Sequence, residues 1–242
     1  MMKCKELKLL PVMAALGAVL LMLRIWLYAV AVDEKGLLIS GHPLDLAVWA
    51  VAAVCLAVAV LAVLRHPQVS APTVGTVAAL GDVAFAVTIA VTVLSMEQPM
   101  TLVEKLRMAM GWLCVPGLGY TAYCRFRSKP VFFGGFAVVC VFFALYLVSS
   151  YQLWSSDPQL QNYVFAMLAC VTLTVFAYQN AAFAVDMGNE KIWLAAGLLA
   201  VCFGIGAVQC SGNGVLMLGI SLWAFTGLTA LEKENGYDVA AQ

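Results

Sequence analysis

The chain of 242 residues is 64% hydrophobic and only 11% charged, and its mean hydropathy is +0.96. Soluble domains are nearer half apolar and a quarter charged, so an ordinary soluble globular domain is excluded. The formal net charge is zero, and no basic tract predicts contact with nucleic acid. This composition is typical of a protein that crosses a lipid bilayer several times.

Apolar runs of the length that crosses a bilayer, about 20 residues, recur along the whole chain, and polar residues with glycine or proline separate them. We therefore expect a single integral membrane domain of the all-α class, a polytopic transmembrane helix bundle with about eight spans. The expected spans are residues 9–32, 46–64, 74–94, 102–123, 131–148, 163–185, 192–208 and 215–231, and residues 232–242 are expected to form a short polar cytoplasmic tail.

The first span follows a short basic segment, residues 1–8. A basic start and an apolar stretch that ends in small residues also make up a cleavable signal peptide. Arg24, Trp26 and Tyr28, however, stand where a cleavage site requires small neutral residues. We therefore expect the first helix to be retained, with cleavage as the alternative.

Two helix starts carry local signals. Asp45 is of the residue type that caps helix N-termini, and it precedes the second span. Thr101 and Glu104 have the spacing of a capping box, which predicts the start of the fourth helix. That helix begins with charged turns and contains Pro116, which is expected to kink it. A helix that lies on the membrane surface is the alternative to a fourth span.

Basic residues predict the orientation of the bundle. With eight spans, both termini lie on the same side, and we place them in the cytoplasm. Nine lysine and arginine residues then lie inside and three outside, in agreement with the positive-inside rule. The inner residues are Lys3, Lys5, Lys8, Arg65, Arg125, Arg127, Lys129, Lys191 and Lys233, and the outer ones are Lys35, Lys105 and Arg107.

Asp82 is the one carboxylate within the third span. An ionisable group at this depth costs roughly 2.5–3.5 kcal/mol on insertion scales, so it should face protein or water and have a partner. Small residues share its helix face, and they allow a second helix to approach closely. The third span is therefore expected inside the bundle. The small residues are Gly75, Ala78, Ala79, Ala86 and Ala90.

Arg24 is the expected partner of Asp82. Counted from the predicted outer ends of their helices, Arg24 lies about 12 Å deep and Asp82 about 18 Å deep. An arginine side chain spans the difference of about 6 Å, and pairing reduces the cost of burying both charges. A structural ion pair is favoured, because one pair without surrounding polar residues makes a poor transport path. A site for an ion, a proton or an anionic substrate is the alternative.

A second candidate site lies on the sixth span. Thr172, Gln179 and Asp186 recur every seven residues and therefore share a helix face, and Tyr178 and Asn180 lie beside that face. Such side chains hydrogen-bond between helices or line a cavity. Docking of a partner on the cytoplasmic side is a further alternative.

No sequence motif indicates catalysis, a cofactor or a metal. The zinc-protease, P-loop, nucleophile-elbow and dinucleotide-binding signatures are absent from the sequence. The eight cysteines form neither a C-x-x-C pair nor a Cys/His cluster. We therefore expect no enzyme activity, no cofactor and no disulfide framework.

The expected protein is a multi-pass protein of the cytoplasmic membrane, and a small transporter or permease-like protein is favoured. Few intramembrane charges suit a small or lipophilic substrate better than a highly charged one. The alternative is a non-enzymatic membrane partner: a permease subunit, an assembly factor or a sensor without its own output domain. A polar cavity from Asp82 to one face favours transport, and a packed interior with an exposed groove of small residues favours the partner. The lipid bilayer is the expected surrounding, and a protein partner or a homo-oligomer is a further alternative.

Overall fold

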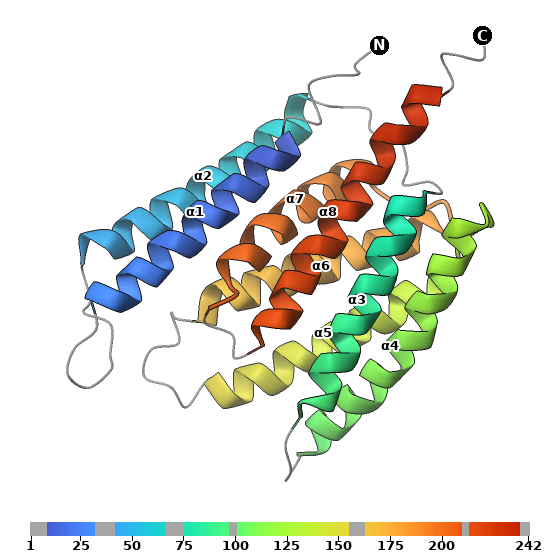
Figure 1. The fold of residues 1–242 in the computed structure, drawn as a ribbon, viewed down its shortest axis with the longest axis horizontal. Coiled ribbons are helices and arrows are strands. Elements are labelled where there is room, and N and C mark those ends of the chain that lie inside the picture. Colours follow the sequence, from blue (N-terminus) through green and yellow to red (C-terminus); the bar gives the residue numbers. More distant parts are fainter. Residues whose placement is uncertain are drawn as a thin grey trace.

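The computed structural model describes residues 9–31, 42–65, 75–96, 101–154, 163–209 and 213–237. These residues form eight α-helices without any strand, so the predicted all-α class is confirmed (Figure 1). The helices are α1 (Leu9–Val30), α2 (Pro43–Arg65), α3 (Thr76–Leu94), α4 (Leu102–Phe126), α5 (Phe133–Trp154), α6 (Val164–Phe183), α7 (Glu190–Gly206) and α8 (Gly214–Tyr237).

Five of the helices are long and apolar enough to cross a bilayer, namely α1, α2, α3, α5 and α6. The helix α7 has 17 residues, and α4 combines its 25 residues with charged first turns. The apolar helices fit a helical membrane bundle. Full crossing by α4, α7 and α8 stays a prediction from the sequence, as does the orientation, because several of the basic residues that set it lie outside the described residues.

Six helices form a closed ring. Each helix from α3 to α8 packs on the next one along the chain, and α8 returns to pack on α3. The helices α1 and α2 pair with each other and pack on α7 from outside the ring (Figure 1). The chain is therefore divided into a six-helix ring and a two-helix hairpin, a division that the sequence analysis did not predict.

Small residues set the close contacts of α3 within the ring. A Cβ atom at Gly81 would collide with the side chain of Thr226 on α8. Ala78, Ala79 and Ala86, which belong to the predicted stripe, are buried. Close approach of neighbouring helices is what small residues permit in a membrane bundle. The small-residue face of α3 is buried as predicted, but α3 lies in the wall of the ring, and its opposite face, with Leu80 and Val87, is exposed.

The hairpin meets α7 through similarly close contacts. A Cβ atom at Gly17 of α1 would lie 2.9 Å from the carbonyl oxygen of Cys202. The thiol of Cys202 also lies 2.9 Å from that of Cys55 on α2, measured between the two Sγ atoms. Both are free thiols. The side of α7 that faces away from the ring is thus covered by the hairpin.

The start of α4 lies where the sequence predicts it, because a local capping motif sets it. Thr101 and Glu104 form the predicted capping box at the start of α4. Asp45, in contrast, lies in the first turn of α2, because that helix begins at Pro43. Two helices extend beyond the predicted ends of their spans. The helix α5 continues past residue 148 to Trp154, and α8 continues past residue 231 to Tyr237, into the predicted tail. Backbone hydrogen bonds continue a helix beyond its apolar run.

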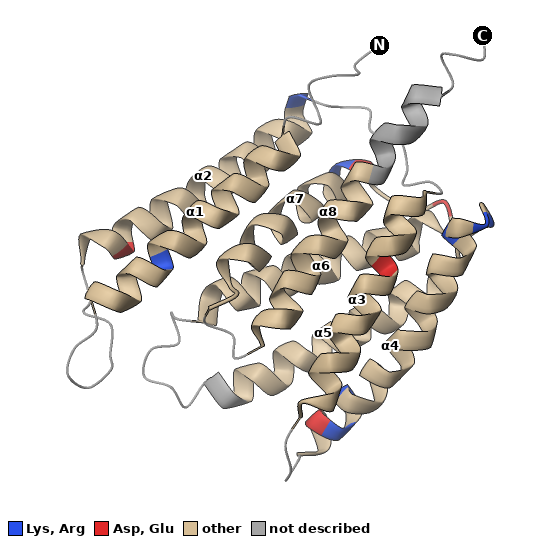
Figure 2. Cartoon of the chain, viewed as in Figure 1, with Lys and Arg blue, Asp and Glu red and all other residues tan. Residues whose placement is uncertain are grey.

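The helix α4 is continuous through Pro116 and packs between α3 and α5. Packing along two helices that are long and apolar enough to span favours the predicted fourth span over a helix on the membrane surface. Charged residues gather near the two ends of the bundle, with few between them (Figure 2). Since α4 runs from one end to the other, its two arginines define these ends, and we call them the Arg107 end and the Arg125 end.

Candidate functional site

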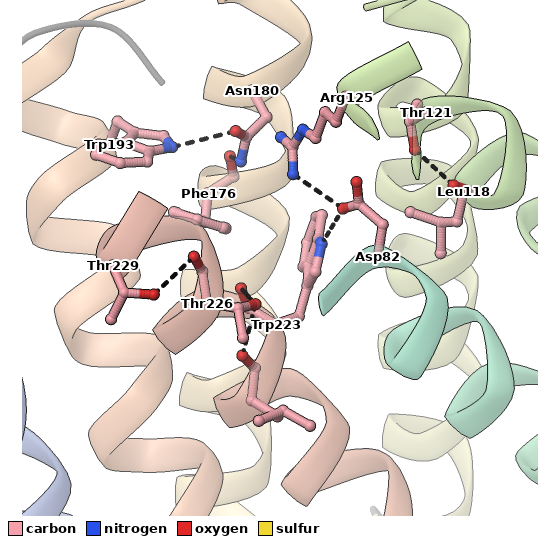
Figure 3. A network of polar contacts seen from close by, with 11 residues as sticks. Asp82, Leu118, Thr121, Arg125, Phe176, Asn180, Trp193, Trp223, Thr226 and Thr229 are labelled. Atoms are coloured by element: carbon pink, nitrogen blue, oxygen red, sulfur yellow. Dashed lines mark hydrogen bonds and ion pairs between the residues drawn. The ribbon is translucent and has the colours of Figure 1, made fainter. Parts of the chain in front are cut away.

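Asp82 lies inside the ring near the Arg125 end. It follows Thr76, the first residue of α3, by six residues, or about 9 Å along the helix axis. Its Oδ1 accepts hydrogen bonds from Arg125 Nη1 at 3.1 Å and from Trp223 Nε1 at 2.7 Å (Figure 3). Arg125 belongs to α4 and Trp223 to α8. One carboxylate oxygen therefore joins three helices.

The predicted Arg24–Asp82 pair is wrong, because Asp82 pairs with Arg125. Arg24 lies on α1, outside the ring, where its Nη1 donates to the carbonyl oxygen of Gly206 at 3.3 Å. Its guanidinium carbon also lies 4.6 Å from the ring centre of Phe165. Arg24 therefore fastens the hairpin to the ring.

The ion pair of Asp82 and Arg125 is sealed from solvent. Asp82 is 0% exposed and Arg125 only 6%, and the guanidinium of Arg125 lies 5.2 Å from the ring centre of Phe136. Among the described residues, Asp82 Oδ2 has no hydrogen-bond partner. A buried polar atom without a partner costs about 1–3 kcal/mol, and more when the group is charged. A proton, a cation or a polar ligand group at Oδ2 would remove this cost.

Four aromatic side chains follow one another inside the six-helix ring, from Asp82 toward the Arg107 end. They are Trp223, Phe85, Phe143 and Tyr146, and we call them the aromatic column. Trp223 stacks on Phe85 with ring centres 4.7 Å apart, and Phe85 faces Phe143 at 6.0 Å. Phe143 in turn contacts Tyr146 at 6.2 Å. All four side chains are buried. The column connects the buried ion pair with the opposite end of the ring.

A second polar cluster lies where the aromatic column reaches the Arg107 end. Arg107 Nη1 donates to Ser149 Oγ at 2.7 Å, and the guanidinium carbon lies 5.2 Å from the ring centre of Tyr146. Asn213, which precedes α8, donates through Nδ2 to the Tyr146 hydroxyl at 3.3 Å. The ring interior is thus apolar and aromatic in its middle and polar at both ends.

The polar residues predicted on the sixth span do not form one site. Thr172 donates to backbone carbonyls of its own helix, and Tyr178 is 61% exposed on the outer surface. Asp186 is exposed and lies beyond Phe183, the last residue of α6, with φ of 57°. The seven-residue spacing therefore does not reach Asp186, because the helix ends before it.

Gln179 and Asn180 are buried, and both bind the start of α7. The backbone N–H of Asn189 donates to Gln179 Oε1 at 2.8 Å. Trp193 Nε1 donates to Asn180 Oδ1 at 3.3 Å (Figure 3), and Trp193 stacks on Phe176 with ring centres 5.4 Å apart. Gln179 and Asn180 therefore form hydrogen bonds between α6 and the start of α7, which is one of the roles expected for them from the sequence.

Sequence reasoning missed Arg125, Trp223 and Arg107 as site residues. Arg125 and Arg107 entered the prediction only as basic residues that set the orientation, and no sequence pattern singled out Trp223. One signal could have found Arg125. Consecutive spans are antiparallel, so the start of α3 and the end of α4 meet at the same end of the bundle. The depth of Asp82 was counted only from the opposite end of α3, and from that end the proximity of Arg125 is not evident.

A shallow groove lies on the outer surface between α4 and α5, with a volume of about 490 Å³. A Cβ atom at Gly135 would lie 2.9 Å from the carbonyl oxygen of Gly117, so the two helices touch through their backbones there. The groove is lined by Gly117, Tyr120, Phe132, Gly134, Gly135 and Val138. It is apolar and separate from the ring interior.

Fold and site define a helical membrane protein with a buried ion pair inside a ring of helices. Comparison with protein-family models, with curated proteins and with solved structures finds no match to this chain. Within the described part of the chain, no group of three His, Cys, Asp or Glu side chains is placed to hold a metal ion. The geometry of the ring interior is therefore the basis for inferring a function.

Proposed function

We propose that the protein is a small transporter of the cytoplasmic membrane, and that its solute passes through the interior of the six-helix ring. Asp82 is the observation that carries this proposal. It is fully buried, and its Oδ2 has no partner among the described residues. A buried ion pair offsets its desolvation only when its remaining polar atoms are satisfied, and packed apolar side chains often serve stability as well or better. A carboxylate kept in this state suits a site that takes up a proton or an ion.

The arrangement of polar groups supports a path along the aromatic column. Polar clusters at both ends of the ring enclose an apolar middle, and the interior is packed in this conformation. Passage of a solute therefore requires that the ends open in turn, by the sliding or hinging of packed helices that is common in conformational switches. The few charges along the path favour a small or partly lipophilic solute with at most one charge.

Proteoliposomes attached to a solid-supported membrane test this proposal. The probes are acetate, benzenesulfonate, tetramethylammonium and glycine, each applied as a concentration jump. We expect at least one probe to produce a transient current above that of empty liposomes, and Asp82→Asn to abolish it. Asp186→Asn is the matched control, because Asp186 is an exposed carboxylate and asparagine tolerates its positive φ. This variant should keep the current.

Folded protein that gives no current with any probe would count against transport, as would an Asp82→Asn variant that transports normally. If Asp82→Asn fails to fold, Asp82→Glu keeps the charge and moves it by one methylene, and an altered current is then expected. A non-enzymatic partner role is the second candidate, and the criterion set from the sequence, a packed interior with an exposed groove of small residues, points to it. The groove between α4 and α5 and the packed ring interior favour it, because glycines at a surface let a further helix approach closely. Absence of all currents would make it the leading hypothesis.

A further inference from the structure

We infer that the Arg107 end of the ring binds the anionic group of the solute, while a flat apolar body lies along the aromatic column. This inference rests on the proposed function and names its substrate class, a small organic monoanion with a planar apolar part. The surroundings of Arg107 differ from those of Arg125, the other arginine of α4, which pairs with Asp82.

Arg107 is a half-buried cation whose direct contacts among the described residues are neutral, and the one carboxylate whose charge acts on it there, that of Glu104, forms no ion pair with it. The direct contacts are the Ser149 hydroxyl and the face of the Tyr146 ring. Glu104, one turn earlier on α4, is directed to the start of the helix, where its Oε2 accepts hydrogen bonds from the Thr101 backbone N–H at 2.7 Å and hydroxyl at 2.9 Å. Charges removed from water are normally paired. The planar guanidinium, with its parallel N–H donors, suits a carboxylate or a sulfonate.

Further polar groups surround the same position. The side chain of Asn213 reaches the Tyr146 hydroxyl from the start of α8, and Ser149 lies one turn beyond Tyr146 on α5. An anion next to Arg107 would thus meet amide and hydroxyl groups from two more helices. Donors from several helices around one cation distinguish this place from an isolated surface arginine.

The aromatic column favours a planar body behind the anionic group. The Phe85 ring is nearly parallel to those of Phe143 and Trp223, at interplanar angles of 7° and 9°. These ring faces cover one another in this conformation, so a planar body stacks on them when the column parts as an end of the ring opens, with gains beyond those of surface burial alone. At the far end of the column, Arg125 is already neutralised by Asp82. A second anionic group at the Arg125 end would be repelled by the Asp82 carboxylate. The ligand therefore carries one negative charge, which lies at the Arg107 end.

Isothermal titration calorimetry of the full chain in detergent tests this inference. The ligands are benzoate and benzenesulfonate, with benzamide as the neutral analogue of benzoate. We expect the two anions to bind the wild type and benzamide to bind far more weakly. Arg107→Gln should weaken the binding of both anions about tenfold or more, as the loss of one partner of a charge pair does. Arg107→Lys should restore part of it, because lysine keeps the charge without the planar fork.

Arg127→Gln is the matched control, because Arg127 is an exposed arginine at the opposite end of α4. It should bind both anions like the wild type. Failure of both anions to bind the wild type, or equal binding by Arg107→Gln, would overturn the inference. This experiment measures equilibrium binding and the earlier one measures flux, so the two can fail separately. If the anions bind in an Arg107-dependent way but no probe gives a current, the anion site is supported and the transport proposal is contradicted. If probes give currents but no Arg107-dependent binding is found, transport is supported and the anion site is contradicted.

Discussion

The two ends of the six-helix ring each hold an arginine of α4, in different surroundings. Arg125 is 6% exposed and pairs with Asp82. Arg107 is half-buried, and its contacts are the neutral Ser149 and Tyr146. Both guanidinium groups lie 5.2 Å from the centre of an aromatic ring. The main difference is a direct ion pair: Asp82 binds Arg125, whereas the Glu104 carboxylate acts on Arg107 without pairing with it, which leaves the Arg107 end suited to an external anion.

Removing Arg125 has the largest expected effect on stability. Arg125→Gln leaves Asp82 buried without its counter-charge, which costs about 3–5 kcal/mol of unfolding free energy. Adding Asp82→Asn should recover most of this loss, because the remaining pair is neutral. A double-mutant cycle from unfolding curves in detergent measures the coupling. Arg24→Gln combined with Asp82→Asn is the control, and their effects should add. Additive effects at residues 82 and 125 would show that the sealed pair does not form.

Trp223→Phe should have an intermediate effect on the same end. Phenylalanine keeps an aromatic ring next to Phe85 but loses the indole N–H that lies 2.7 Å from Asp82. A hydrogen bond to a charged group contributes about 1.5–3 kcal/mol, and we expect a loss of this size in the thermal unfolding of the purified protein. Trp112→Phe serves as the comparison, because Trp112 is 47% exposed on the outer surface of α4, and it should change stability by less than about 0.5 kcal/mol. Equal losses in both variants would contradict the contact with Asp82.

Arg107→Gln should have the smallest effect on stability. Arg107 is only half-buried, it has no internal carboxylate to leave unpaired among the described residues, and glutamine can still hydrogen-bond to Ser149. We expect a loss of about 1 kcal/mol or less, measured in the same unfolding assay. A loss as large as that of Arg125→Gln would mean that both arginines serve stability, and the contrast between the two ends would disappear.

Residue patterns along the chain were enough to predict the all-α class and the approximate position of every helix. Long apolar runs separated by polar residues, glycine and proline are a strong signal in a membrane protein, because every backbone polar group in lipid must be paired within a helix. The start of α4 followed from Thr101 and Glu104, whose side chains act within one turn. The burial of α3 followed from its small residues. Each of these features depends on residues close together in the chain.

The pairing of polar residues, in contrast, depends on how the helices pack against one another in the folded chain. Depth along a helix follows from residue number, but the neighbour of each helix face does not. Asp82 points into the ring from α3, whereas Arg24 lies on α1, outside the ring. The same limit separated Tyr178, on the outer surface, from the adjacent Gln179 and Asn180 in the interior. Lipid tails are as apolar as the helices themselves, so hydrophobic patterning says little about which helices become neighbours. Close packing of small residues and a few polar contacts select the neighbours, and both require the folded chain.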